Sequence, residues 1–275
     1  MVISKQKLLH WTSGVLVALL LAGLAWPWLN WPSTSTDYLL YSQTYFSAQR
    51  TNRPVLVVVL HGDAPFNQPS YQYMLAQRVA QAVPDVVAVG LLRPGYTDPA
   101  GHHSPGRRGT ATGDNYRPRE VDAIAATVQA LRRGYHARRV VLAGHSGGAT
   151  LTGDLLGRYP ALADAALLAA CPCDVPAFRQ HMARQHFSPM WWRPVPFLSP
   201  QEWVDQVRPG LPVRVVTGLA DPIALPTYSQ RYAAALRQRH VAVELVELPS
   251  QGHEIFLTPA VMVQLKGLIS GLTTQ

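Results

Sequence analysis

The chain has 275 residues, of which 48% are hydrophobic and 15% are charged. This composition supplies enough apolar material for one large folded domain and excludes a chain that is disordered throughout. The 24 Lys and Arg residues outnumber the 16 Asp and Glu residues, but the arginines are scattered and no nucleic-acid motif surrounds them. We therefore expect a solvated basic surface, with attraction to an anionic membrane as the alternative and no nucleic-acid partner.

The first segment of the chain differs from everything after it. Lys5 and Lys7 precede an uncharged apolar run at residues 14–26. A positive start before about 13 apolar residues is typical of a secretory signal, whereas a free-standing transmembrane helix needs about 20. Residues 8–29 could still span a membrane as an uncleaved anchor, because aromatic residues near the end of this stretch suit a membrane interface. Residues 1–32 are thus predicted to be a signal peptide or a membrane anchor, and the protein to be exported (periplasmic or extracellular) or tethered.

Residues 33–275 are predicted to form one α/β domain. Continuous runs of β-branched and aliphatic residues, typical of strands buried on both faces of a parallel sheet, alternate with stretches of helical spacing. The predicted strands are 55–60, 86–92, 140–143, 165–170, 213–217 and 241–248, and the predicted helices are 71–83, 121–131, 149–159, 228–239 and 258–268. This alternation predicts an open, mostly parallel sheet with helices on both faces, whose ligands bind beyond the carboxyl ends of the strands.

The connection at residues 174–211 is rich in Trp, Phe, Pro and Met. We expect it to form a small lid, with simple packing onto the sheet as the alternative. Just before it, Cys171 and Cys173 are separated by one proline. A bridge between such close neighbours would need a strained ring, so the sequence predicts two free or weakly paired thiols. Two thiolates without a nearby His do not complete a zinc site, and no metal is expected.

A glycine-rich pentapeptide, Gly144-His145-Ser146-Gly147-Gly148, follows one predicted strand directly and runs into a predicted helix. This is the context that a Gly-x-Ser-x-Gly elbow requires. The sharp turn puts the serine in strained backbone geometry, and neighbours without a Cβ let the strand and the helix pass closely. Ser146 is therefore the candidate nucleophile, exposed above the edge of the sheet.

The motif and the residues that follow it resemble the α/β-hydrolase superfamily, over roughly residues 55–268. Asp221 comes just after the strand predicted at residues 213–217, and His253 comes just after the last predicted strand. Nucleophile, acid and base therefore stand in the order of that superfamily. The resemblance implies the α/β-hydrolase fold, with His253 as the base that activates Ser146 and Asp221 as the acid that orients His253. Asp174 and Asp205 are rival acids, of which Asp174 is the better because it follows the strand before the lid.

The resemblance also implies two backbone donors for an oxyanion: the N–H of Gly147 and the N–H of Asp63, in the loop after the strand at residues 55–60. An acidic side chain at this position departs from the usual pattern, because a carboxylate near the oxyanion would oppose its charge unless it points away. His61 and His145 are expected to be structural or to line the pocket. The loop at residues 93–96 resembles one that shapes the site in this superfamily.

These features predict a serine hydrolase that cleaves a carboxylic ester through an acyl-enzyme. The alternatives are a serine peptidase of the prolyl-oligopeptidase-like type and an acyltransferase or perhydrolase, since the fold does not separate them. A non-catalytic binding protein is less favoured, because all three members of the triad are present. No cofactor is expected. The expected partner is a small-molecule or peptide acyl substrate, and neither its binding residues nor the oligomeric state can be deduced from the sequence.

Overall fold

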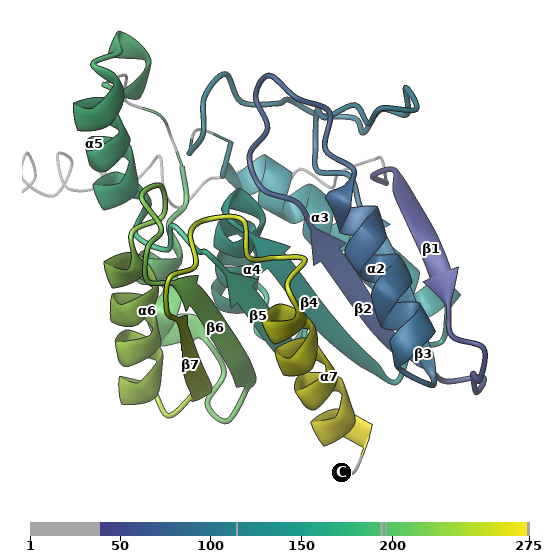
Figure 1. Cartoon of the computed structure of the whole chain (residues 1–275). Helices are drawn as coiled ribbons and strands as arrows, with labels where there is room; N and C mark the ends of the chain where they lie inside the picture. The colour runs from purple at the N-terminus through teal and green to yellow at the C-terminus, as the bar shows by residue number, and fades with distance from the viewer. Residues whose placement is uncertain (1–38, 114, 193–194, 196, 274–275) are drawn as a thin grey trace, which may run out of the picture. The chain divides into compact units, whose positions relative to one another are not determined.

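In this computed structural model, the described residues are 39–113, 115–192, 195 and 197–273. They contain a seven-stranded sheet with the strand order β1-β3-β2-β4-β5-β6-β7 (Figure 1). Strands β2 to β7 are parallel, and only β1 is antiparallel to its neighbour β3. The strands are β1 (Ser42–Phe46), β2 (Val55–Leu60), β3 (Val86–Leu91), β4 (Arg139–His145), β5 (Ala165–Ala169), β6 (Pro212–Gly218) and β7 (Ala242–Leu248). The prediction of an open, mostly parallel sheet is confirmed.

Helices cover both faces of this sheet. Helices α2 (Tyr71–Ala82) and α7 (Pro259–Thr273) pack on one face, and α3 (Pro118–Gly134), α4 (Gly147–Arg158) and α6 (Pro226–Gln238) pack on the other. Alternate residues of β2 belong to two separate cores. Val57 lies in the core under α2 and α7, and Val58 lies in the core under α3, α4 and α6. The continuous apolar runs of the sequence follow from this arrangement, because successive side chains of a strand point to opposite faces and both faces are buried.

Strand β1 is the one strand of the described sheet that the hydrophobic pattern did not predict. Its side chains are mostly half-buried, and it pairs with β3 from Ser42↔Leu91 to Phe46↔Val87 at one edge. An edge strand packs on one side only, so it needs no continuous apolar run. The predicted strands and helices are all present, and their ends differ from the prediction by a few residues.

The connection between β5 and β6 has two parts with different surroundings. Helix α5 (Val175–His186) projects from the carboxyl edge of the sheet and is followed by the short helix η1 (Pro189–Trp191). The second short helix, η2 (Pro200–Gln206), packs on α4, where Gly153 and Gly157 leave room for Pro200 and Trp203. Only the first part therefore stands where a lid would stand, and the second part packs onto the fold.

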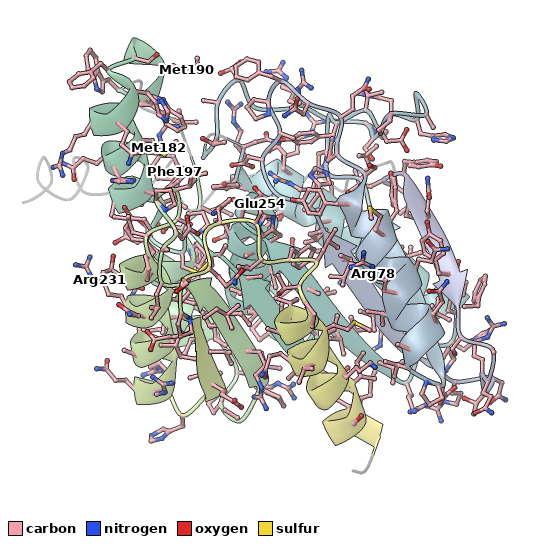
Figure 2. All side chains as sticks on the ribbon, viewed as in Figure 1. Arg78, Met182, Met190, Phe197, Arg231 and Glu254 are labelled. Carbon is pink, nitrogen blue, oxygen red and sulfur yellow. A yellow bond between two sulfur atoms is a disulfide. The ribbon has the colours of Figure 1, made fainter. Side chains whose placement is uncertain are left out.

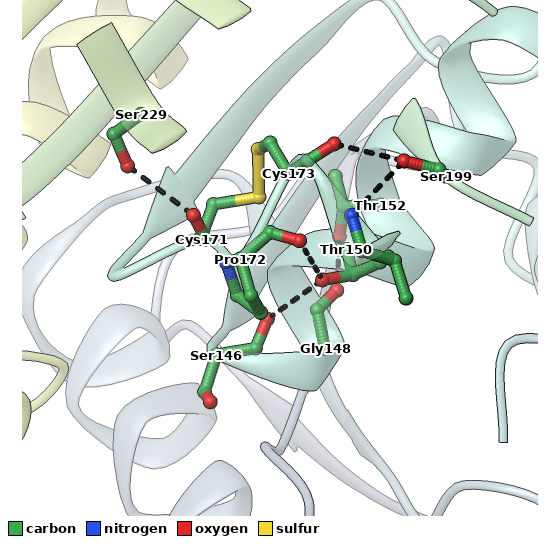
Figure 3. The surroundings of a disulfide bond; sticks show 10 residues. Ser146, Gly148, Thr150, Thr152, Cys171, Pro172, Cys173, Ser199 and Ser229 are labelled. Atoms are coloured by element: carbon green, nitrogen blue, oxygen red, sulfur yellow. Dashed lines mark hydrogen bonds between the residues drawn. A yellow bond between two sulfur atoms is a disulfide. The ribbon is translucent and has the colours of Figure 1, made fainter. Parts of the chain in front are cut away.

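The prediction of free thiols is wrong, because Cys171 and Cys173 form a disulfide, with their Cα atoms 5.1 Å apart (Figure 3). The chain directly after β5 turns sharply enough to bring the two neighbours into bonding range, which the sequence spacing did not reveal. The turn lies beside the serine elbow. The Thr150 hydroxyl contacts the carbonyl oxygen of Pro172 at 3.4 Å and that of Ser146 at 3.5 Å, so one side chain joins the two turns.

Residues 1–38 lie outside the described residues, and with them the predicted signal peptide or anchor at residues 1–32. Within the part of the chain that the structure describes, no helix combines the length and the apolarity needed to cross a membrane.

Candidate active site

Ser146 occupies the sharp turn between β4 and α4. Its backbone angles are φ 51° and ψ −121°, a left-handed conformation that costs free energy for a residue with a side chain. The turn is held by the hydrogen bond from the Ser146 N–H to the carbonyl of Ala169 at 2.9 Å. Gly144 and Gly148 are required beside it, because a Cβ on Gly144 would collide with the Gly148 carbonyl and a Cβ on Gly148 would collide with the carbonyls of Leu60 and His61. The strained turn holds Ser146 beyond the end of the strand.

The structure brings together the three residues that the sequence predicted as a triad. His253 Nε2 lies 2.9 Å from Ser146 Oγ, and His253 Nδ1 lies 2.8 Å from Asp221 Oδ2. Asp221 is buried, and its other oxygen accepts the backbone N–H groups of Ile223 at 2.8 Å and Ala224 at 3.0 Å. With Asp221 fixed in this way, His253 can donate through Nδ1 and accept the serine proton at Nε2.

The two rival acids have other partners. Asp174 caps the N-terminus of α5 and accepts the Ala177 N–H at 3.1 Å. Asp205 lies on η2 in an exposed ion pair with Arg239. Neither carboxylate is hydrogen-bonded to His253 in the described structure, so Asp221 is the acid that the geometry supports.

The two expected oxyanion donors lie side by side. Gly147 is the first residue of α4, and it packs so closely against Asp63 that a Cβ there would collide with the Asp63 carboxylate. Within the described residues, no acceptor is bound by the backbone N–H of Gly147 or of Asp63. Both donors therefore remain available to a ligand beside Ser146, and the first also carries the partial positive charge of a helix N-terminus.

The Asp63 carboxylate, which the sequence marked as a departure from the family pattern, is fully engaged. Its Oδ1 pairs with the Arg93 guanidinium at 2.9 Å, and its Oδ2 accepts the Gly113 N–H at 2.8 Å and the Tyr116 hydroxyl. Arg93 is completely buried, and its charge offsets that of the carboxylate. The acid can therefore stand beside Gly147 without leaving an uncompensated negative charge at the site.

A second network joins the loop after β2, which carries Asp63 and which we call the oxyanion loop, to the loop after β7, which carries His253. The Tyr71 hydroxyl accepts the Gly62 N–H and lies 2.9 Å from His145 Nδ1, while His145 Nε2 lies 3.0 Å from the His253 carbonyl. Burial, together with the nearby His253, lowers the pKa of His145 to about 4, so its ring is neutral near pH 7. It then accepts from Tyr71 and donates to His253, which ties both loops to the serine elbow.

His61 is also structural, as expected. It is completely buried, and burial and Arg93 hold the pKa of its ring well below the usual value. The neutral ring donates from Nδ1 to the Gly62 carbonyl at 2.7 Å and accepts the Arg93 N–H at Nε2 at 3.0 Å. His61 therefore fixes the loop that carries Asp63.

A pocket of about 370 Å³ opens onto Ser146 and His253. The loop after β2 lines one side of it and Phe178 of α5 lines another. Glu254, directly after His253, is an exposed carboxylate in the lining, and it lies near the centre of the carboxyl edge in Figure 2. The full lining consists of Gly62, Asp63, Ala64, Asn67, Gln68, Pro69, Ser70, Tyr71, Thr112, His145, Ser146, Phe178, Ile223, His253 and Glu254.

Sequence reasoning missed Tyr71 and Tyr116. Tyr71 was assigned to a helix by its periodicity, and nothing in that pattern shows that its hydroxyl reaches the Gly62 N–H. Tyr116 lies in an irregular loop that carried no interpretable motif. The available signal for the network around Asp63 was Arg93. An arginine buried beside the site would require an anion, and Asp63 was an unexplained acid on the neighbouring loop.

Comparisons with known proteins agree with this architecture. The structure is similar to Est1E from Butyrivibrio proteoclasticus, with a TM-score of 0.63 and 14% identity, over 85% of this chain and 94% of that one. It is similar to esterase PE8, with a TM-score of 0.59 and 15% identity, over 83% of this chain and 97% of that one. The acylaminoacyl peptidase of Pyrococcus horikoshii has a TM-score of 0.60 and 14% identity, over 84% of this chain but 38% of that one. A search of curated proteins found no match.

The fold is thus that of the α/β-hydrolases, a superfamily of serine esterases, lipases and peptidases. The model of the prolyl oligopeptidase family matches residues 109–266, more than half of the chain. The chain belongs to the prolyl oligopeptidase family.

Proposed function

We propose that the protein is a serine hydrolase that cleaves a carboxylic ester, with Ser146 as nucleophile, His253 as base and Asp221 as the acid that orients the base. The observation that carries this proposal is the unbroken chain of contacts from Ser146 Oγ to His253 Nε2 at 2.9 Å and from His253 Nδ1 to Asp221 at 2.8 Å. Two unengaged backbone N–H groups beside the serine complete the requirements for acyl transfer.

In the proposed mechanism, Ser146 Oγ attacks the carbonyl carbon of the ester while His253 Nε2 takes the hydroxyl proton. Asp221 stabilises the imidazolium that forms. The carbonyl oxygen becomes an oxyanion and receives the N–H groups of Gly147 and Asp63. When the intermediate collapses, the leaving alcohol takes the proton from His253 and the acyl group remains on Ser146. A water molecule, deprotonated by His253, then releases the carboxylic acid and regenerates the serine.

One observation supports an ester rather than a peptide bond. The pocket of about 370 Å³ lies near the lower end of the size range of small-molecule sites, with Phe178 on one side.

A substrate panel tests the bond type. p-Nitrophenyl esters of several acyl lengths should be hydrolysed with a kcat/KM far above that for aminoacyl anilides and short peptides. The reverse order would assign the protein to the peptidases. The Ser146→Ala variant serves as the blank for both substrate classes.

We also propose that the catalytic domain is exported, or is held outside the cytoplasm by residues 8–29. The apolar run after Lys5 and Lys7 supports this. The Cys171–Cys173 disulfide adds support, because such bonds persist mainly in oxidising compartments. An alkaline phosphatase fused to the C-terminus should be active in cells. In a parallel fusion, a fluorescent protein replaces the phosphatase. Fluorescence in the cytoplasm, with no fusion protein in the membrane fraction, would refute the export.

A further inference from the structure

Large apolar side chains are exposed on two segments that flank the mouth of the Ser146 pocket. On the loop after β2, Phe66 is 83% exposed, and on the segment after α5, Phe187 is 82% and Trp192 63% exposed. Both segments follow the carboxyl ends of parallel strands and therefore leave the same edge of the sheet (Figure 1). Met190 is also exposed, at the outer end of the α5 segment (Figure 2). We call Phe66, Phe187, Met190 and Trp192 the rim residues.

Both segments are connected to the lining of the Ser146 pocket. Ala64 and Asn67, which flank Phe66 in the sequence, line the Ser146 pocket, and so does Phe178 of α5. Phe178 in turn contacts Trp191, the neighbour of Trp192, with ring centroids 6.3 Å apart. The segments that carry the rim residues therefore adjoin the Ser146 pocket, and Phe187 and Trp192 line a neighbouring hollow of about 560 Å³ beside α5.

The backbone at Phe187 shows that its exposure is not incidental. Phe187 ends α5 in the left-handed conformation, with φ 45° and ψ 34°. Glycine is usual at such a helix end, because a side chain there costs free energy. A phenylalanine that is strained and also points into water does not stabilise the isolated domain. Strained positions of this kind point to a contact made outside the domain.

Exposed arginines accompany the rim residues. Arg184 of α5 is exposed, and residues 175–201 contain no Asp or Glu. Arg107 and Arg108 are exposed on the loop after β3, which leaves the same edge of the sheet. None of these three arginines forms an ion pair with any of the described acidic residues. Glu254 is the exposed carboxylate among the residues that line the pocket.

We propose that this edge docks on the surface of an anionic lipid bilayer. Aromatic side chains prefer the boundary between headgroups and acyl chains, and arginines bind anionic headgroups, so apolar rings interspersed with cations match such a surface. Docking in this orientation turns the mouth of the Ser146 pocket toward the bilayer. Acyl esters dissolved in the membrane then lie directly beside the nucleophile. This consequence rests on the proposed hydrolase function, but the docking does not depend on that function.

A site-specific fluorophore tests the docking in the full-length chain. The two native cysteines are buried in a disulfide, so a dye attaches selectively to the new thiol of a Phe187→Cys variant. Val263 on α7 is 62% exposed on another element, and Val263→Cys provides the matched control.

With vesicles of phosphatidylcholine and phosphatidylglycerol, the emission of the dye at residue 187 should shift to the blue, and the shift should weaken in high salt or with phosphatidylcholine alone. The dye at residue 263 should not respond. The proposal is overturned by an unchanged emission at residue 187 or by an equal shift at residue 263. It is also overturned by a shift that needs no vesicles and grows with protein concentration, since a second copy would then cover the face.

A second comparison uses the chain without dye. Replacing both Phe187 and Trp192 by Ser should weaken binding to anionic vesicles at least roughly tenfold, because two aromatic rings are lost from the interface. Val263→Ser should leave binding unchanged, and both variants should hydrolyse a water-soluble ester like the natural protein. Unchanged vesicle binding in the double variant would contradict the docking even if the esterase activity is confirmed.

Discussion

The Asp63–Arg93 pair offers a direct test of how the oxyanion loop is held. Arg93 is completely buried and the Asp63 side chain is 4% exposed. Asp63→Asn would keep an acceptor for Gly113 and Tyr116 but would leave the guanidinium charge without its anion. Breaking a buried pair by removing one partner costs about 3–5 kcal/mol. For a domain of this size, about 2–4 °C per kcal/mol corresponds to a fall in Tm of about 6–20 °C.

The exposed pair of Asp205 and Arg239 supplies the control, because the Asp205 side chain is 76% exposed. Asp205→Asn should cost less than about 1 kcal/mol. Both variants are compared with the natural protein by thermal and urea unfolding. Replacing Arg93 by Met in the Asp63→Asn background should recover part of the loss, since the stranded charge is removed. Equal losses in Asp63→Asn and Asp205→Asn would refute the reasoning.

Three further predictions follow from the described contacts. Asp221→Asn should lower kcat of ester hydrolysis by several orders of magnitude. Asp174→Asn should change kcat little, because an asparagine also caps the helix; equal kinetic losses would leave the acid unassigned. Tyr71→Phe should lower kcat about tenfold with little change in KM, because Tyr71 holds the oxyanion loop rather than the substrate; a change confined to KM would place it in binding instead. Burial raises the pKa of the Asp154 carboxyl well above its usual value, and no described residue hydrogen-bonds to that carboxyl. The folded state therefore holds the proton more tightly than the unfolded chain does. Its stabilising contribution is present below a pH of about 4 and is lost as the pH rises through the folded pKa, so the Tm advantage of Asp154→Asn should grow from acidic to alkaline pH, and a constant difference would contradict it.

The sequence predicted the parallel part of the sheet well, because strands such as β2 are buried on both faces and must be apolar throughout. It missed β1, since an edge strand packs on one side and tolerates polar residues. It predicted Ser146, Asp221 and His253 to follow strands that the hydrophobic pattern marks clearly, and in the structure these residues follow β4, β6 and β7 at the carboxyl edge of the sheet. The side chains of these three residues then point toward one another and lie within hydrogen-bonding distance.

Other parts of the site depend on contacts that no local pattern carries. The role of Asp63 becomes clear only when Arg93 and Tyr116, from two different loops, meet its carboxylate. The disulfide of Cys171 and Cys173 depends on a sharp turn that the spacing of the two cysteines disfavoured. Irregular loops are shaped by long-range contacts rather than by periodicity, and for that reason their roles appear only in the folded structure.

Covalent labelling of Ser146 tests the central claim most directly. A fluorophosphonate should react at neutral pH with Ser146 alone, as located by mass spectrometry of the digested protein, because among the described residues this is the hydroxyl that lies 2.9 Å from His253 Nε2. A folded His253→Ala variant should react far more slowly, and a folded Ser146→Ala variant should neither react nor turn over an ester. Labelling at another residue, or ester hydrolysis that persists in folded Ser146→Ala, would contradict the account.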